Sequence, residues 1–478
     1  TNRISGEVFA MKRVSADQMD MSLEEITAEL DVQKLLDHPN ICKILESFID
    51  VANKEVYIIM EQCTGGSIAE KLTKGGAFSE VVTATLVDKM LSAVLYCHMH
   101  GVIHRDIKLD NFLYESDADD AELKMIDFGF AAEAHRSGEE SMTDILGTPS
   151  YMAPELWDER QYDSSVDMWA IGVTAFMMLS CKRPFQHTDA EQKRQLICHA
   201  PLKFPSPQWD HTSSSCKDFI SLLMEKEPQN RLSASKARNH EWITSRSTRQ
   251  SAVVASINTF ANSFELFAKK GELAKLALEV IAFTTAPAKL RELRDMFTRI
   301  DTDGSGTISL EEFQAAMASA PDIDVARVES MYAGIDVDGS GQLDYTEFLS
   351  AMLAAKKQAE GSLRSAFDFL DVDKDGYITR ADLQAATQQR LDEQSIAGLL
   401  KHTDESGRVD FAAFKGLMNE GLMNDGLKSE RRMSQEAQPP EDSQPTGEHQ
   451  AAEQPTSLII ASLNKGIEVG KELTRQFV

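Results

Sequence analysis

A fourfold repeat in the second half of the chain limits its fold more than any other feature. Between Leu290 and Met418, a helical stretch, an acidic loop with glycine and a second helical stretch recur four times. The loops begin at Asp301, Asp336, Asp371 and His402. Successive loops are therefore 35, 35 and 31 residues apart. A period of this length indicates supersecondary units that pack against their neighbours, so we expect an all-α domain of paired units.

The first two loops place oxygen-bearing side chains at the spacing that a calcium ion requires. Both resemble the EF-hand loop, in which side-chain oxygens and one backbone carbonyl surround the ion and a central glycine allows a sharp turn. Ile308 is expected to pair with the neighbouring loop through a short β bridge. The expected ligands are Asp301, Asp303, Ser305, the Thr307 carbonyl and Glu312 in the first loop, and Asp336, Asp338, Ser340, Gln342, Asp344 and Glu347 in the second.

The third and fourth loops depart from this pattern. The third ends in aspartate, whose shorter side chain favours six ligands and hence Mg²⁺ or weaker Ca²⁺ binding. Its expected ligands are Asp371, Asp373, Asp375, the Tyr377 carbonyl and Asp382. In the fourth loop His402 replaces the first aspartate and Ala413 the last glutamate, so we expect no useful affinity. Its expected role is to pair with the third unit.

Length and charge narrow the class of protein. A chain of 478 residues is too long for one core, and its 42% hydrophobic and 26% charged residues are ordinary for a soluble multidomain protein. The net charge of −27 argues against nucleic acid as a partner and favours cations. No uninterrupted run of about 18 apolar residues predicts a membrane span.

The cysteines suggest a cytoplasmic protein, and the N-terminus leaves its membrane anchoring open. The six cysteines all lie in the first half without metal-ligand spacing, so reduced and mostly buried thiols are expected. Since the sequence starts at Thr1, we expect the true N-terminus to be missing, and N-terminal membrane anchoring stays open.

The first half carries an ordered set of catalytic motifs. His104-Arg105-Asp106-Ile107-Lys108-Leu109-Asp110-Asn111 is followed by Asp127-Phe128-Gly129 and by Ala153-Pro154-Glu155. Together these motifs resemble the protein kinase family, for which phosphoryl transfer requires positioned substrates and neutralised charge. The resemblance implies that Asp106 accepts or orients the substrate hydroxyl proton and that Lys108 stabilises the transferring phosphoryl group. Asn111 and Asp127 would hold Mg²⁺.

Upstream residues complete the expected nucleotide site. The resemblance places Lys12 on the strand that contacts the α- and β-phosphates, with Glu29 as its ion-pair partner. Met60 would be the gatekeeper, and Val56 to Met60 is predicted to be a strand. Adenine would meet backbone groups of Glu61 and Cys63, between apolar walls from Ala10 and Leu113. The expected fold is an α+β bilobal kinase with an incomplete N-lobe.

Other residues refine this resemblance. Lys108 and Gly147-Thr148-Pro149 are similar to the serine/threonine branch, and Arg231 is expected to pair with Glu155. Asp110 favours basic substrates, although Ser67 stands where many such kinases carry glutamate. Negative charge near Arg105 is expected from Glu139, Glu140, Asp144 or a phosphorylated Thr143.

The Gly-rich loop of kinases should lie just before Ile4. We expect that the sequence begins after this loop, through truncation of the chain. A pseudokinase that acts as a Ca²⁺-sensing scaffold is the alternative.

The segment between the two halves completes a resemblance to the calcium-dependent protein kinases of plants and protists. Its apolar stripes are Phe260, Phe264 and Phe267, then Leu273, Leu276 and Val280, and it also carries Lys269, Lys270 and Lys275. The resemblance implies that Ca²⁺-loaded EF-hand lobes capture this junction and relieve inhibition. The implied partners are ATP with Mg²⁺, Ca²⁺, protein substrates with Ser or Thr, and the junction helix itself.

The expected domain boundaries follow from these patterns. They are 1–243 for the kinase domain, 244–289 for the junction, 290–354 and 355–418 for the EF-hand pairs, 419–455 for a disordered linker and 456–478 for a short amphipathic helix.

Overall fold

The computed structural model describes residues 8–19, 21–118, 120–129, 131–133, 147–246, 257–318, 325–386 and 407–419. The predictions for His402, the activation-loop carboxylates and Thr143, the linker after Asn419 and the terminal helix fall outside these ranges. The side chains of Glu29 and Phe260 also lie outside the description.

A three-stranded antiparallel sheet forms the N-lobe. Its strands are β1 (Ala10–Ser15), β2 (Ile44–Asp50) and β3 (Glu55–Met60), in the order β1-β3-β2. The predicted strand before the gatekeeper is therefore confirmed. Helices α1 (Ala16–Met19) and α2 (Leu23–Lys34) complete the lobe, and a capping box of Ser22 and Glu25 fixes the start of α2.

The C-lobe is mainly helical. Its helices are α3 (Ile68–Gly75), α4 (Glu80–Met99), α5 (Pro154–Trp157), α6 (Ser165–Ser180), α7 (Ala190–His199), α8 (Ser214–Leu223), α9 (Ala234–Arg238) and α10 (Glu241–Arg246). Two 3₁₀ turns, η1 (Leu109–Asn111) and η2 (Pro228–Asn230), and four short strands, β4 (Val102–Ile103), β5 (Phe112–Tyr114), β6 (Leu123–Met125) and β7 (Ala132–Glu133), complete it.

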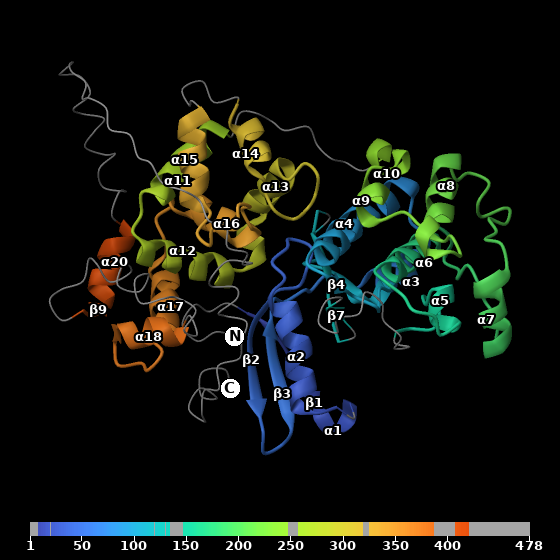
Figure 1. Ribbon diagram of the computed structural model, residues 1–478, viewed down its shortest axis with the longest axis horizontal. Coiled ribbons are helices and arrows are strands. Elements are labelled where there is room, and N and C mark those ends of the chain that lie inside the picture. The colour runs from blue at the N-terminus through green and yellow to red at the C-terminus, as the bar shows by residue number, and fades with distance from the viewer. Residues whose placement is uncertain are drawn as a thin grey trace.

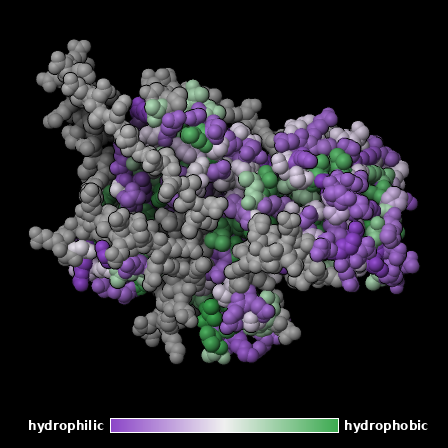
Figure 2. Space-filling view, viewed as in Figure 1, coloured by the Kyte–Doolittle hydropathy of each residue, from purple (hydrophilic) through white to green (hydrophobic). Residues whose placement is uncertain are grey.

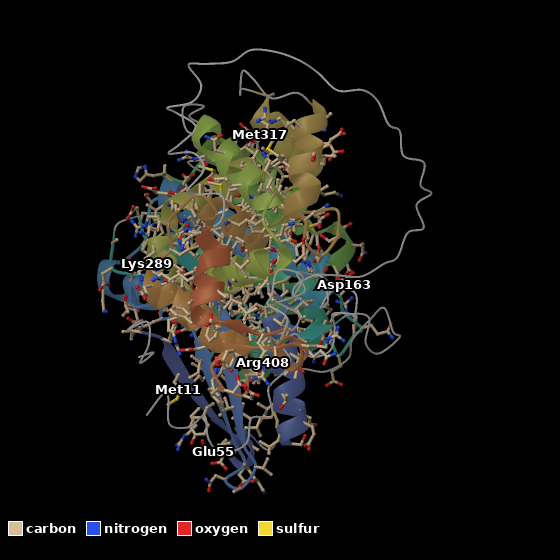
Figure 3. All side chains as sticks on the ribbon, turned by 90° about the vertical axis from the view of Figure 1, so that its left-hand side faces the viewer. Met11, Glu55, Asp163, Lys289, Met317 and Arg408 are labelled. Carbon is tan, nitrogen blue, oxygen red and sulfur yellow. The ribbon has the colours of Figure 1, made fainter. Side chains whose placement is uncertain are left out.

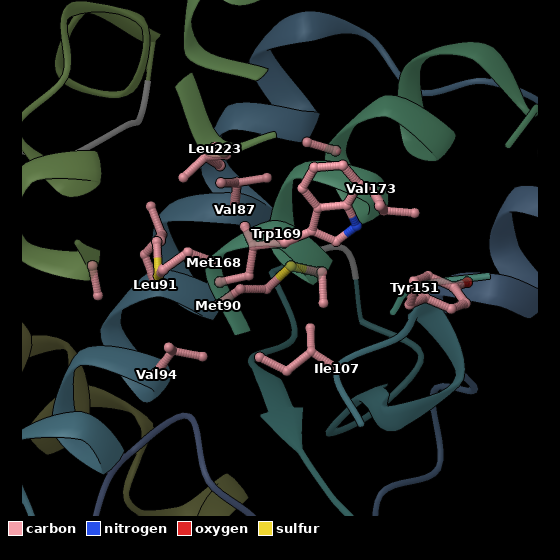
Figure 4. Close-up of a cluster of buried hydrophobic side chains, with 14 of the residues drawn as sticks. Val87, Met90, Leu91, Val94, Ile107, Tyr151, Met168, Trp169, Val173 and Leu223 are labelled. Atoms are coloured by element: carbon pink, nitrogen blue, oxygen red, sulfur yellow. The ribbon is translucent and has the colours of Figure 1, made fainter. Parts of the chain in front are cut away.

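Helices α4 and α6 carry the centre of the C-lobe core. Figure 4 shows Val87, Met90 and Leu91 of α4 beside Trp169 of α6, with Ile107 of the catalytic loop below them. By length and composition α4 could cross a membrane, but 61% of its apolar window is buried inside the protein. The helix therefore serves as the core helix on which the catalytic loop rests.

The junction folds as two helices that pack with the EF-hand units in one continuous core. These helices are α11 (Ile257–Ala268) and α12 (Glu272–Thr284), followed by the turn η4 (Pro287–Lys289). Phe264 and Phe267 are fully buried, and the Phe264 ring meets the Phe313 ring edge to face at 5.1 Å. Along the described part of the chain, α11 packs on α15 and α16, and α12 packs on α16 and α17. The EF-hand units thus clasp the junction.

The EF-hand helices follow the repeat. They are α13 (Arg291–Ile300), α14 (Leu310–Met317), α15 (Val325–Ile335), α16 (Tyr345–Leu353), α17 (Glu360–Leu370), α18 (Arg380–Ala386) and α20 (Phe411–Asn419). The predicted bridge joins Ile308 to Leu343 through two backbone hydrogen bonds of 2.8 and 2.9 Å. Strands β8 (Tyr377–Ile378) and β9 (Val409–Asp410) pair the third and fourth units in the same way, as predicted. Two paired lobes result.

The two EF-hand pairs lie at different places along the kinase domain. Figure 1 shows the EF-hand helices on one side of the molecule and the C-lobe helices on the other, with the N-lobe sheet below. Figure 3 places Met317 of the first pair at the top, Glu55 of the sheet at the bottom, and Arg408 of the second pair between them. The surface over the C-lobe helices is predominantly hydrophilic (Figure 2).

The first EF-hand pair docks on the kinase domain through buried polar contacts. Asp37 accepts a 2.6 Å hydrogen bond from the Thr346 amide, and both residues are buried. Arg294 of α13 forms a 2.5 Å ion pair with Glu115, just beyond β5, and both side chains are at most 5% exposed. Lys43 lies 4.4 Å above the Phe283 ring of α12. A buried charge pair between domains favours one relative orientation, because a shift that separates the partners leaves a charge buried without its counter-charge.

Candidate active site and metal-binding loops

Asp106 sits at the centre of a short hydrogen-bond network in the C-lobe. Thr148 donates a 2.7 Å hydrogen bond to Asp106 Oδ1. Lys108 bonds to Oδ2 and also to Thr148, the latter at 3.2 Å. Asn111 donates to the Asp106 carbonyl at 2.9 Å and to Oδ2 at 3.2 Å. The predicted base, cation and metal ligand thus lie within one network, and Thr148 orients the carboxylate.

The backbone of the catalytic loop is held from below by Asp167. Its two oxygens accept hydrogen bonds from the amides of His104 and Arg105 at 3.0 and 2.9 Å, and from His98 at 2.9 Å. Burial alone would raise the pKa of Asp167, but His98 and the other donors outweigh it and lower the pKa. Asp167 therefore stays ionised and anchors the loop, while Arg105 at φ 65° makes the sharp turn before Asp106.

Lys12 and Asp127 bring the two lobes together at the nucleotide site. Their side chains form a 2.8 Å ion pair, and both are partly exposed to the cleft. Partial burial would raise the pKa of Asp127, but the hydrogen bond and charge of Lys12 outweigh it and lower the pKa. The predicted pairing of Lys12 with Glu29 lies outside the described side chains.

The predicted adenine-contacting segment links the lobes beside the gatekeeper. Ala10 pairs with Met60 across the sheet, and Leu113 on β5 forms a β bridge with Ser67, shortly after the segment. The side chain of Glu61 is tied down by the Lys43 amide at 2.8 Å and by Lys124 at 3.0 Å. Cys63 is half-buried, and four of the six free cysteines are fully buried, as expected. The Glu61 side chain is structural, which leaves backbone groups for recognition.

Glu155 and Arg231 form the predicted buried ion pair. Two parallel hydrogen bonds join them at 2.5 and 2.6 Å, and both side chains are at most 1% exposed. A bidentate pair of this kind fixes geometry as well as charge. It holds the segment that leads from Thr148 to α5 against the rest of the C-lobe.

Three loops bring carboxylates together in the way a divalent cation requires. Ligand atoms lie within 4.8 Å of one another in each group, which are Asp301, Asp303 and Glu312, then Asp336, Asp338 and Glu347, then Asp371, Asp373 and Asp375. Central glycines donate to the first aspartate of each loop, as Gly306 does to Asp301 at 3.0 Å. Ser305 and Ser340 donate to the carbonyls of Thr307 and Gln342 at 3.1 and 2.8 Å, respectively, so each serine hydroxyl lies beside the predicted carbonyl ligand of its own loop.

The glutamates that end the first two loops have two tasks. Glu312 and Glu347 complete capping boxes with Ser309 and Asp344 at the starts of α14 and α16. Each also accepts a 2.8 Å hydrogen bond from the second residue of its loop. One side chain therefore connects the loop to the helix that leaves it.

The donor sets fit a resident divalent cation. Asp301 Oδ1 and Asp371 Oδ1 are buried without a hydrogen-bond partner, which is costly unless an ion is bound. Burial raises the pKa of Asp301 to about 7 and, with Asp344 nearby, raises the pKa of Glu347 strongly. A divalent cation would stabilise the ionised carboxylates of both loops, and hard oxygen ligands suit Ca²⁺ or Mg²⁺.

The third loop differs at its last position. Asp382 accepts hydrogen bonds from the Val372 amide at 3.1 Å and the Thr379 amide at 2.9 Å. The group of close ligand atoms contains Asp371, Asp373 and Asp375, so the shorter Asp382 does not reach it. Tyr377 lies in β8, opposite Asp410 of β9. In the fourth unit, Asp410 caps α20 by accepting from the Ala413 amide at 2.7 Å.

Some functional contacts were missed from the sequence. His98 lies on α4, outside the catalytic motifs, and hydrogen-bonds to Asp167. No local sequence pattern marks it. Arg238 of α9 donates to the Asp303 carbonyl in the first calcium loop at 3.1 Å, across the domain boundary. The hydrogen bond from Thr148 to Asp106 was also missed, although the motif Gly147-Thr148-Pro149 could have indicated it.

Comparison with protein families agrees with this geometry. The model of the protein kinase domain matches residues 1–243, which is just over half of the chain. The model of an EF-hand domain pair matches residues 290–353, and a single EF-hand domain model matches residues 362–391.

Curated relatives combine the same parts. Calcium-dependent protein kinase 12 of Oryza sativa subsp. japonica is 33% identical over 66% of this chain and 58% of its own. CDPK-related kinase 8 of Arabidopsis thaliana is 32% identical over 66% of this chain and 52% of its own. Calcium-dependent protein kinase 5 of Plasmodium berghei is 29% identical over 68% and 57%, respectively. The chain thus spans less than two thirds of the length of each.

Proposed function

Because the chain belongs to the protein kinase family and carries EF-hand domains, we propose that it is a Ca²⁺-activated serine/threonine kinase. It would transfer the γ-phosphate of ATP to Ser or Thr hydroxyls of proteins. The observation that carries this proposal is the network around Asp106, in which Thr148, Lys108 and Asn111 converge on one buried carboxylate. The names of the relatives support the calcium half of the proposal.

The residues of the network divide the work of phosphoryl transfer. Asp106 would accept the proton of the substrate hydroxyl, because its Oδ atoms are oriented by Thr148 and Asn111. Lys108 would move its charge from Asp106 to the phosphoryl group in the transition state. Since catalysis here is positioning plus charge neutralisation, no covalent intermediate on the protein is needed.

Lys12, Asn111 and Asp127 fit the nucleotide and its magnesium. Mg²⁺ with ATP would supply charge neutralisation at the phosphates. The Asp127 carboxylate, kept ionised by Lys12, provides a hard oxygen ligand, and the Asn111 side chain lies next to Asp106 to provide a second. The backbone of Glu61 and Cys63, between Ala10 and Leu113, would bind adenine.

Control by Ca²⁺ would act through the junction. Helices α11 and α12 are clasped by α15, α16 and α17, so the EF-hand units hold the segment that leads out of the kinase domain. The buried Phe264 and Phe267 match the grooves that opened EF-hand lobes present to apolar helices. Loading of the loops would thereby keep the junction away from the catalytic cleft.

A phosphotransfer assay tests the proposal. Transfer from ATP to a generic serine peptide is measured with Ca²⁺ and with a chelator, in the presence of Mg²⁺. We expect Ca²⁺ to raise the rate, and Asp106→Asn to lower it by about 10²- to 10⁴-fold, the usual contribution of a general base. Equal rates in the wild type and Asp106→Asn would show a scaffold with a pseudokinase domain instead.

A further inference from the structure

The kinase domain reaches into one calcium loop with a buried guanidinium. Arg238 lies at the end of α9 and is 6% exposed. Its Nε pairs with Asp88 of α4 at 3.1 Å, which fixes the side chain on the C-lobe. Its Nη1 donates to the carbonyl of Asp303, the third residue of the first loop, at 3.1 Å. A positive group of the C-lobe is therefore built into the surroundings of a cation site.

The glycines of the first loop make this close approach possible. A Cβ atom added at Gly304 would lie 1.0 Å from Arg238 Nη1, so the guanidinium fills the space that a side chain would occupy. A Cβ added at Gly306 would lie 2.5 Å from both His38 and Tyr96 of the kinase domain. The first loop thus contacts the kinase domain through its two glycines, Gly304 and Gly306.

The second loop has the same glycines but a different environment. Gly339 and Gly341, at the equivalent positions, adopt the same left-handed conformation, and an added Cβ would meet nothing within 4 Å. The third loop carries Lys374 at the position of Gly304 with φ 60°, so the turn itself accepts a side chain there. The space restriction at Gly304 therefore comes from docking, not from the turn.

We propose that Arg238 couples the first calcium loop to the docking of the EF-hand domain: its guanidinium holds the loop on the C-lobe and opposes a divalent cation there. The inference rests on the proposed function, because it needs the first loop to bind Ca²⁺. The carboxylates of the loop attract either cation, but two positive charges held next to the same loop repel each other. By reciprocity, the factor by which Arg238 weakens Ca²⁺ binding is the factor by which Ca²⁺ weakens this contact.

The contacts of Arg238 support the same direction. Asp88 and the Asp303 carbonyl hold the guanidinium in place, so its positive charge stays next to the first loop. Bound Ca²⁺ would make the guanidinium an unfavourable neighbour, although Asp88 would still partner it.

Calcium affinity of the full chain tests the proposal. In a background of Glu347→Gln and Asp371→Asn, which silences the other loops, Ca²⁺ binding to the first loop is measured by calorimetry. We expect Arg238→Gln to tighten binding by ~5-fold or more, within the ~5- to ~150-fold range of such couplings. Arg238→Lys keeps the charge and should stay close to wild type. Lys236→Gln removes an exposed charge from the same helix and should change nothing.

The outcomes separate this proposal from the function on which it rests. Unchanged or weaker Ca²⁺ binding in Arg238→Gln would overturn the role of Arg238 alone. No Ca²⁺ uptake by the first loop in any variant, or uptake that survives Glu312→Gln, would overturn the calcium half of the proposed function as well.

A second measurement does not depend on Arg238 variants folding. Gly304→Ala and Gly339→Ala introduce the same backbone strain at equivalent positions, but only the first displaces Arg238. Hydrogen exchange of amides in α9 and α4 should therefore rise in Gly304→Ala and stay unchanged in Gly339→Ala. An equal response of both variants would contradict docking through this loop.

Discussion

The first EF-hand unit and the units that follow it are alike in sequence and unlike in surroundings. Loops one and two share the pattern Asp-x-Asp-Gly-Ser-Gly, yet Gly304 to Gly306 are buried against the kinase domain while Gly339 to Gly341 are exposed. The entering helices show the same contrast. Arg294 and Arg364 both lie seven residues before the first loop aspartate, but only Arg294 is buried between domains. Equivalent residues of a repeat therefore acquire different tasks from their position in the assembly.

The arginine pair offers the largest test of this comparison. Arg294→Met should destabilise the docked arrangement by about 3–5 kcal/mol, because Glu115 would remain buried without its partner. Arg364→Met should cost only about 0.3–0.5 kcal/mol, since its pair with Asp368 is half exposed at the arginine and lies along a single helix. Thermal unfolding of the two variants measures the difference. Similar losses would mean that the first unit is no more firmly docked than the third.

Calcium binding by the first two loops gives the next largest effect. Glu312→Gln and Glu347→Gln should each weaken Ca²⁺ binding to their own loop by ~100-fold, because a charged, potentially bidentate ligand is lost. The double variant should blunt activation of the kinase by Ca²⁺, measured as peptide phosphorylation. Full activation of the double variant would remove these two loops from control of the catalytic domain.

The third loop gives the smallest effect. Asp382→Glu should strengthen Ca²⁺ binding by ~10-fold and reduce competition by Mg²⁺, because the longer side chain can reach the group formed by Asp371, Asp373 and Asp375. Calorimetry with and without millimolar Mg²⁺ reports both changes. If Asp382→Glu leaves the affinity unchanged, the length of this side chain does not limit the site.

Local sequence was enough to predict the chemistry of both halves. The catalytic motifs, the strand before Met60, the Glu155–Arg231 pair and the Ile308 bridge all depend on residues whose spacing or motif context is fixed within a short stretch. The loop ligands follow from a 12-residue pattern that needs no distant partner. Even the weakened third and fourth loops were readable, because single substitutions at ligand positions have direct consequences for charge and reach.

Only the tertiary structure decided which of the two matching loops the kinase domain contacts, and which of its residues make that contact. Arg238 and Asp303 lie 65 positions apart, and Arg294 and Glu115 are separated by 179. No periodicity or motif relates such residues, because their contact depends on how two independently patterned domains meet. The amino-acid sequence specified the ligands and the catalytic groups, and the packing of one domain on the other gave equivalent residues different electrostatic neighbours.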